Sequence, residues 1–417
     1  MFLGSWFLPK TNRWRKFRVT RAPKEPIQVD DEVRVILGAM VHGGHCLAHP
    51  LGHTAFVRHG LPGEDVTLRI TEVRSKFVRA DVVEVHQASE FRIDAPCNWA
   101  RPNGCGGCDY QHIDLTHQRE IKGVIARESL QRQAGIDVGP ITVLDLGDDG
   151  GLGWRTRMRW SVDGSGNAGL LGARSHGVLP IDTCLLASSE ITALNITAQE
   201  WPGTQSVQAT QDSLSEVSVW ADRDLVSGSR KSVQSVRHRT WQIESTGFWQ
   251  VHPKAAESIV GHVLDFGVPK AGESWLDLYA GAGLISAFLG EAVGQSGNVT
   301  AVESYRSAVR DGRRALSDLP QVKFVDADVE QWPVPPVVDG VVLDPPRRGA
   351  GVQVMESVAL AQPRVIVYVA CDPVAFARDA AFLIAAEYEL TGFVVLDAFP
   401  MTQHMECIAK FTPVATV

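Results

Sequence analysis

Two residues far apart in the sequence could act together as a nucleophile and a base. Cys371 follows the apolar run at residues 365–370, which reads as a buried β-strand, and Pro373 stiffens the turn after it. Glu406 stands at the start of a second strand-like run, at residues 406–411. If both strands belong to one α/β sheet, the thiol and the carboxyl lie at the edge where such sheets bind ligands. A buried thiol without chemistry is the competing interpretation of Cys371.

A second group of residues could hold a metal. Cys97, Cys105 and Cys108 form a C-x7-C-x2-C pattern in a turn-rich segment with two glycines between the last two thiols. Such spacing is compatible with tetrahedral zinc and with an iron–sulfur cluster, and both need a fourth ligand. Cys184, which lies in a turn-like stretch, is the best candidate. Three unrelated buried thiols remain the alternative.

Composition excludes several classes of protein. The 417 residues are 44% apolar and 21% charged, which is typical of a folded protein with two or three domains and not of a disordered or fibrous chain. No run of 18 apolar residues occurs, so we expect no membrane-spanning helix and no membrane partner. The seven cysteines are an odd number, and no secretory signal is recognisable. A reducing, cytoplasmic location is therefore expected.

The chain divides into four regions, and the predicted fold class is multidomain α/β. Residues 1–24 carry seven Lys or Arg and no acid, although the whole chain has a net charge of −8, and we expect them to be a disordered tail. Residues 25–88 read as short strands of an OB-like β-barrel. Residues 89–240 read as a central mixed β domain that holds the cysteine site, with a helix at about 114–135 that packs on the catalytic domain. Residues 241–417 alternate strands and helices, which predicts a doubly wound, Rossmann-like sheet.

The residues that would line a cofactor site are spread over the ends of four strands in the last region. They are Tyr279, Gly281 and Gly283 after the first strand, Glu303 at the end of the second, Asp328 at the end of the third and Asp344 after the fourth. Glycines let the backbone pass close to a ligand, and acids at strand ends bind ribose hydroxyls or a base. Ser286 replaces the third glycine of the dinucleotide fingerprint. The pattern resembles S-adenosylmethionine-dependent methyltransferases more than NAD enzymes; a catalytically empty domain is the alternative.

Four segments together resemble the RNA 5-methyluridine methyltransferase family (the TrmA/RumA type). They are DLYAGAG at 277–283, LDPPRRGAG at 343–351, YVACDPVAFARD at 368–379 and HMECIAKF at 404–411. The resemblance extends over residues 25–417, and the barrel, with Leu-Pro-Gly-Glu at 61–64, looks like the RNA-binding TRAM domain of that family.

The resemblance implies two cofactors. One is S-adenosyl-L-methionine, with Gln250 at its methionine end beside the strand-end residues named above. The other is a [4Fe-4S] cluster, rather than zinc, with Cys97, Cys105, Cys108 and Cys184 as its ligands. Family members that modify rRNA carry both TRAM domain and cluster, so the implied partner is RNA, 23S rRNA rather than tRNA, and a monomeric enzyme is expected.

The resemblance also implies a covalent mechanism. Cys371 would attack C6 of an unstacked uridine, C5 would take the methyl group, and Glu406 would remove the C5 proton, while Asp344 holds cofactor or base. This chain departs from the family at Asp372, where Asn is usual, and at Leu284, where a polar residue is common. The first cysteine gap is seven residues instead of five. The competing functions are a nucleic-acid N-methyltransferase that uses the Asp-Pro-Pro segment at 344–346, and a non-catalytic RNA-binding factor.

Overall fold

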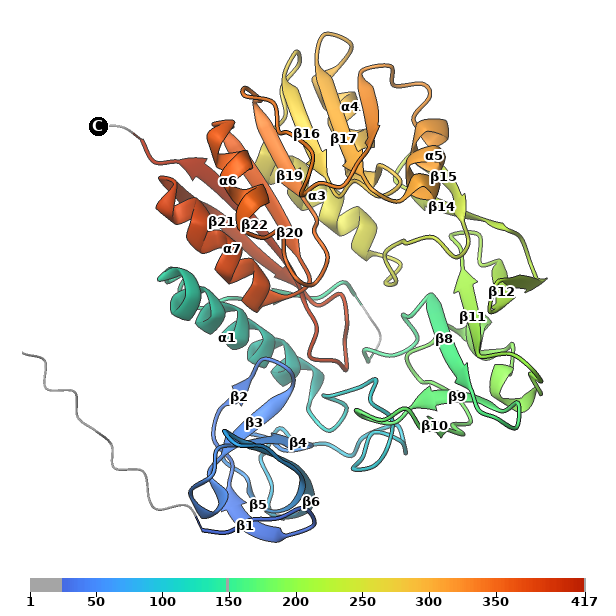
Figure 1. The fold of residues 1–417 in the computed structure, drawn as a ribbon, viewed down its shortest axis with the longest axis vertical. Coiled ribbons are helices and arrows are strands. Elements are labelled where there is room, and N and C mark those ends of the chain that lie inside the picture. Colours follow the sequence, from blue (N-terminus) through green and yellow to red (C-terminus); the bar gives the residue numbers. More distant parts are fainter. Residues whose placement is uncertain (1–24, 148–149, 416–417) are drawn as a thin grey trace, which may run out of the picture.

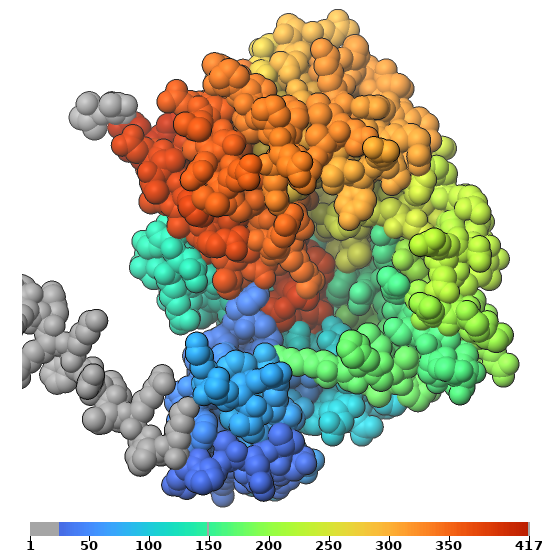
Figure 2. Space-filling view, viewed as in Figure 1, coloured from blue at the N-terminus to red at the C-terminus, as the bar shows by residue number. Residues whose placement is uncertain are grey.

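A computed structural model describes residues 25–147 and 150–415, so the basic tail expected at 1–24 lies outside the described residues. An N-terminal curved sheet, a central β domain and a large α/β domain surround a hollow (Figures 1 and 2). In the described part of the chain, no helix has the length and apolar character needed to cross a membrane.

The N-terminal domain, called the barrel below, is a six-stranded sheet in the order β1-β5-β6-β4-β3-β2. The strands are β1 (Glu32–Ile36), β2 (Met40–Val41), β3 (His45–Ala48), β4 (Ala55–Arg58), β5 (Asp65–Val73) and β6 (Val78–Gln87). In β5, Val66, Leu68 and Ile70 are fully buried and alternate with more exposed residues. This two-residue period places one face of the sheet on the core.

The central domain is a second six-stranded sheet, in the order β10-β9-β8-β11-β12-β13. Its strands are β8 (Arg157–Val162), β9 (Ala168–Leu171), β10 (Val178–Leu179), β11 (Ser206–Gln211), β12 (Val217–Ala221) and β13 (Asp224–Ser227), and its short helices are α2 (Ser189–Thr192) and η2 (Ile196–Ala198). A further short helix, η1 (Pro50–Gly52), belongs to the barrel. Met158, Trp160 and Val207 belong to its core.

The hairpin of β14 (Lys231–Val236) and β15 (Arg239–Glu244) corrects the boundary that we placed between residues 240 and 241, because that boundary falls inside β15. The hairpin is a separate two-stranded sheet and is fixed to the α/β domain: Asp311 of that domain accepts from Lys231 Nζ at 2.7 Å and from Glu244 N at 2.8 Å.

The α/β domain is an eight-stranded sheet in the order β18-β17-β16-β19-β20-β22-β21-β7. The strands are β16 (Ser274–Leu278), β17 (Asn298–Glu303), β18 (Val322–Asp326), β19 (Gly340–Leu343), β20 (Val365–Ala370), β21 (Tyr388–Leu396), β22 (Glu406–Pro413) and the short β7 (Val143–Leu144); the helices are α3 (Ala255–Gly267), α4 (Leu284–Val293), α5 (Arg306–Ala315), α6 (Val352–Leu360) and α7 (Pro373–Ala385). Strands β16 to β20 are parallel, and β22 is antiparallel to β20.

Side chains of β20 alternate between the two faces of this sheet. Ile366 and Tyr368 join the core beneath α6 and α7, whereas Val367 and Val369 join the core beneath α3 and α4. Both faces are covered, which is the doubly wound arrangement and explains why these strands are continuous apolar runs.

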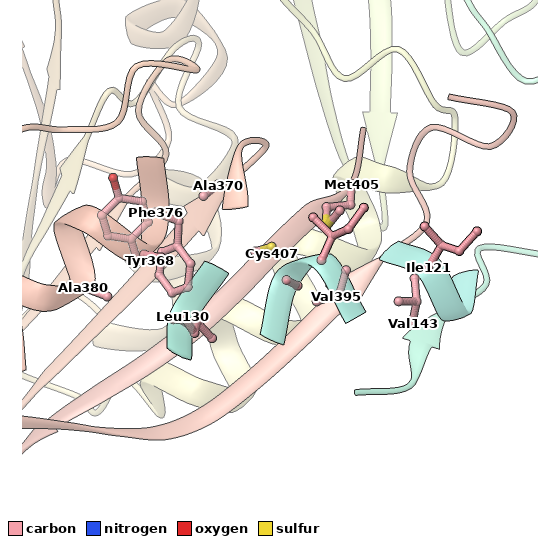
Figure 3. Close-up of a cluster of buried hydrophobic side chains, with 14 of the residues drawn as sticks. Ile121, Leu130, Val143, Tyr368, Ala370, Phe376, Ala380, Val395, Met405 and Cys407 are labelled. Carbon is pink, nitrogen blue, oxygen red and sulfur yellow. The ribbon is translucent and has the colours of Figure 1, made fainter. Parts of the chain in front are cut away.

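Helix α1 (Leu115–Ala134) joins the barrel to the α/β domain, and it packs on α7. Figure 3 shows its Ile121 and Leu130 in one cluster of buried side chains with Cys407 and Val395 of the large sheet. Asp114 caps the start of the helix through the N–H groups of residues 116 and 117. The apolar core therefore runs without interruption from the barrel through α1 into the sheet that carries the candidate site.

Candidate active site

The loop between β16 and α4 adopts a conformation that its glycines permit. Gly281 and Gly283 have φ values of +56° and +79°, and Tyr279 also has a positive φ of +66°. A Cβ atom at Gly283 would stand 2.6 Å from Cζ of Phe324, so no larger residue fits there. A left-handed loop of this kind leaves room for a ligand against the backbone at the start of α4.

Glu303 ends β17 and organises this loop. One carboxylate oxygen accepts from Gly281 N at 2.9 Å, and the other accepts from Tyr305 N at 2.7 Å. The residue is 8% exposed, so these hydrogen bonds are largely shielded from water. The acid that the sequence pattern selected thus lies directly beside the glycine loop and fixes its backbone.

Asp328 requires a correction. The third strand, β18, ends at Asp326, and Asp328 lies two residues later in an exposed turn, where it accepts from Glu330 N at 3.0 Å. The sequence offers two acids separated by one alanine, and alternation alone did not decide which of them ends the strand.

The thiol and carboxyl of the predicted pair meet through strand register. Ala370 pairs with Cys407 in the antiparallel ladder of β20 and β22. Because antiparallel partners run in opposite directions, the next residue, Cys371, stands opposite Glu406. The charge of Glu406 acts on Cys371, which agrees with this placement.

Buried carboxyl groups surround this pair. Burial, and then the charge of the nearby Asp277, raises the pKa of Asp344, which follows β19, to about 7. Burial also raises the pKa of Asp277 to about 7. Burial, and then the charge of Asp344, raises the pKa of Glu406, which Arg347 opposes. A carboxyl with a raised pKa is suited to accepting a proton near neutral pH.

The sequence interpretation missed two side chains beside the pair. Arg347, in the loop after β19, lowers the pKa of Cys371 through its charge, and His404 Nε2 lies 3.2 Å from a guanidinium nitrogen of Arg347. Their signal was present in the Asp-Pro-Pro-Arg-Arg and Gln-His-Met-Glu segments, but a polar residue near a motif does not reveal which way it faces. Gln250 is half-buried in the segment between β15 and α3.

The four predicted cysteine ligands line one small cavity in the central domain, together with Trp99, Leu170 and Ile181. Gln111 Nε2 donates to Cys108 Sγ at 3.2 Å, and Gly107 N donates to Cys105 Sγ at 3.4 Å. Among the residues that the structure describes, no three His, Cys, Asp or Glu side chains are grouped so as to hold a metal ion. The structure therefore shows the four cysteines along one cavity.

Comparisons with known proteins identify relatives along the whole chain. A family model described as tRNA (uracil-5-)-methyltransferase matches residues 336–411, and a TRAM domain model matches residues 27–83. An uncharacterised RNA methyltransferase of Streptomyces coelicolor is 38% identical, with 98% of each chain covered. One of Corynebacterium efficiens is 34% identical, with 94% of this chain and 98% of the relative covered.

A solved structure shares the fold. The tRNA (uracil-54, C5)-methyltransferase of Pyrococcus abyssi, in complex with S-adenosyl-L-homocysteine, superposes with a TM-score of 0.69 at 21% identity, and the match covers 91% of this chain and 100% of that chain.

Proposed function

Because this chain belongs to the S-adenosylmethionine-dependent RNA methyltransferases of the uracil-5 type, we propose that it methylates C5 of a uridine in 23S rRNA through a covalent adduct with Cys371. The observation that carries the proposal is the position of Cys371 opposite Glu406, at the sheet edge that also carries the glycine loop.

The reaction follows from this arrangement. The Cys371 thiolate attacks C6 of the uracil, which makes C5 an enolate-type nucleophile. S-adenosylmethionine, when bound, supplies the methyl group that C5 takes. Glu406 then removes the C5 proton, and the returning electron pair expels the thiolate from C6. The base must leave its stack to reach a thiol at this depth.

The cofactor would be held by the residues around the glycine loop. Gly281 and Gly283 let the chain approach it, Glu303 faces its ribose, and Tyr279 lies at the same turn. Gln250 and Asp344 would hold its methionine end, and Asp328 would lie toward its base. The positive φ angles of the loop and the open space beside Gly281, where nothing lies within 4 Å of a Cβ, support this assignment.

A [4Fe-4S] cluster on Cys97, Cys105, Cys108 and Cys184 forms the second part of the proposal. The shared cavity and the N–H donors aimed at two sulfurs support it, since such hydrogen bonds are common around iron–sulfur clusters. A cluster is larger than one ion, so its four thiolates stand farther apart than the ligands of zinc.

The cluster assignment is tested by anaerobic purification. Iron, zinc and acid-labile sulfide would be measured in the wild type, in Cys184→Ser and in Cys46→Ala, whose thiol lies in the barrel and bonds the Gly60 carbonyl. We expect iron and sulfide in equal amounts, lost in Cys184→Ser and retained in Cys46→Ala. Zinc without sulfide would contradict the assignment.

The choice of 23S rRNA rests on the combination of a TRAM domain with the four-cysteine segment, which the resemblance associates with rRNA-modifying members. We further propose that the enzyme acts as a cytoplasmic monomer. A tRNA target is the competing outcome, since the matched family model and the Pyrococcus abyssi relative both carry tRNA in their names.

One experiment tests target and mechanism together. Protein purified anaerobically is incubated with S-adenosylmethionine and with 23S rRNA or tRNA that carries tritium at uridine C5. We expect tritium release from 23S rRNA that depends on the cofactor and is lost in Cys371→Ala. Tritium release only from tRNA would show that the target is tRNA and not 23S rRNA. Methylation without tritium release would favour an N-methyltransferase. If neither tritium release nor methylation occurs, the RNA-binding factor would be favoured.

A further inference from the structure

The barrel reaches the active site through the turn between β2 and β3, at residues 42–44. Gly43 N donates to Oε1 of Gln403, in the loop that leads to Glu406, at 3.3 Å. A Cβ atom at Gly44 would lie 3.3 Å from the Cβ of Gln403, so the turn packs closely against this loop. His42 Nε2 lies 3.2 Å from Oδ2 of Asp372, the residue that follows the nucleophile.

Asp372 uses both carboxylate oxygens. Oδ1 accepts from Val374 N at 3.0 Å and from Ala375 N at 2.8 Å, which caps α7, while Oδ2 faces His42. Burial opposes ionisation of this carboxyl, but the hydrogen bonds from His42 and from the helix outweigh it, and the pKa of Asp372 is lowered. A carboxylate therefore stands beside the nucleophile where the family usually has a neutral Asn.

This carboxylate adds to an acidic environment. Burial raises the pKa of Cys371 to about 12, and the charges of nearby acids contribute to the rise. The charged groups that act on the thiol are Glu406 of β22, Asp344 and Arg347 of the loop after β19, and Asp372 itself. His404 stands next to Arg347, and the charge of His42 acts on His404 from the barrel. Only a thiolate attacks C6, so whatever offsets the charge of Asp372 favours the reaction.

We propose that His42 is a positioning residue of the reaction: from the RNA-binding barrel it fixes Asp372 and offsets the carboxylate beside Cys371. The inference rests on the proposed function, and it makes the barrel part of the active site as well as an RNA-binding domain. The residue acts through Asp372, not on the substrate. The Asp at position 372 and the His at position 42 thus belong together, although 330 positions separate them.

The test compares His42→Ala, Asp372→Asn and the double variant with the wild type. His53→Ala is the matched control, since this second barrel histidine bonds the Glu25 carbonyl at the surface. The first readout is the pH profile of Cys371 alkylation by iodoacetamide, followed by peptide mass spectrometry without RNA or S-adenosylmethionine. The second is kcat and KM for methylation of RNA.

We expect His42→Ala to move the alkylation profile to higher pH and to lower kcat about tenfold, the effect of about one pKa unit, with KM for RNA nearly unchanged. Asp372→Asn should move the profile to lower pH. In the Asp372→Asn background, His42→Ala should have little further effect, because the charge to be offset is gone. His53→Ala should behave as the wild type.

Two results would overturn the proposal: a wild-type profile and kcat in His42→Ala, or an equal loss from His42→Ala in both backgrounds. If His42→Ala unfolds at a lower temperature than the wild type, His42→Gln, which keeps an N–H donor, is compared in the same two backgrounds. Alkylation needs no methyl transfer. If the wild type does not methylate uridine, the proposed function is contradicted. The alkylation profiles would still decide whether His42 acts on Cys371 through Asp372.

Discussion

Cys371 and Glu406 stand opposite each other where the antiparallel ladder of β20 and β22 ends, one pair beyond Ala370 and Cys407. Neighbouring strands of a sheet lie about 5 Å apart, so the register brings the two side chains into one site although 35 residues separate them in the sequence. Burial, and then the charge of Asp344, raises the pKa of the Glu406 carboxyl, and the charge of Arg347 opposes this rise.

Replacing Glu406 by Gln should trap the reaction after methyl transfer. The amide cannot remove the C5 proton, so the bond between Cys371 and C6 persists. We expect a protein–RNA adduct on a denaturing gel and a loss of turnover of at least about 100-fold, the usual contribution of a general base. The double variant Glu406→Gln/Cys371→Ala is the control and should form no adduct. An adduct in the double variant would show that another residue is the nucleophile.

Asp344→Asn should make stability less dependent on pH. Burial raises the pKa of Asp344 to about 7, so the folded protein binds more protons than the unfolded chain between about pH 4 and pH 7. Stability therefore falls as pH rises through that window. The neutral amide removes this loss, and we expect a Tm at pH 8 that is about 2–4 °C above the wild type, with little difference at pH 5. Thermal unfolding at the two pH values checks this, and a variant that is less stable at pH 8 would contradict it.

Gly283→Ala should impair the cofactor loop more than Gly281→Ala. A methyl group at Gly283 meets Phe324 at 2.6 Å and Leu316 at 3.0 Å, whereas nothing lies within 4 Å of a Cβ at Gly281. Both positions have positive φ, which costs a non-glycine residue about 1–2 kcal/mol, and crowding adds about 1–3 kcal/mol at Gly283 alone. Calorimetric titration with S-adenosylmethionine should show the larger loss for Gly283→Ala. Equal losses would mean that backbone conformation alone decides.

Lys122→Met should destabilise the joint between α1 and the α/β domain. Lys122 Nζ, fully buried, bonds Asp397 Oδ1 at 2.6 Å and the Phe399 carbonyl at 3.0 Å. Removal of the lysine leaves a buried carboxylate that has lost one of its cationic partners and keeps Arg119 at 3.0 Å, and we expect a loss of about 3 kcal/mol. Urea unfolding measures it. Arg132→Met, which removes an exposed pair with Glu128 on the same helix, should cost less than about 0.5 kcal/mol.

The sequence predicted the family and most of the strands and loops that carry the candidate residues. The strands and loops near residues 279, 303 and 371 could be predicted because apolar runs, glycines and acids at strand ends are local signals in the sequence. The motifs predicted the family, and the matched family models and the relatives confirm it. The same local rules left the end of β18 ambiguous between Asp326 and Asp328, since both fit the pattern.

The sequence by itself determined which residues could react, since side-chain chemistry and motif spacing are properties of the chain. Only the tertiary structure decided which of them meet. The register of β20 and β22 pairs Cys371 with Glu406, and the approach of the barrel brings His42 to Asp372. These contacts join segments that are 35 and 330 residues apart in the sequence, and local sequence patterns do not specify how such segments pair or pack.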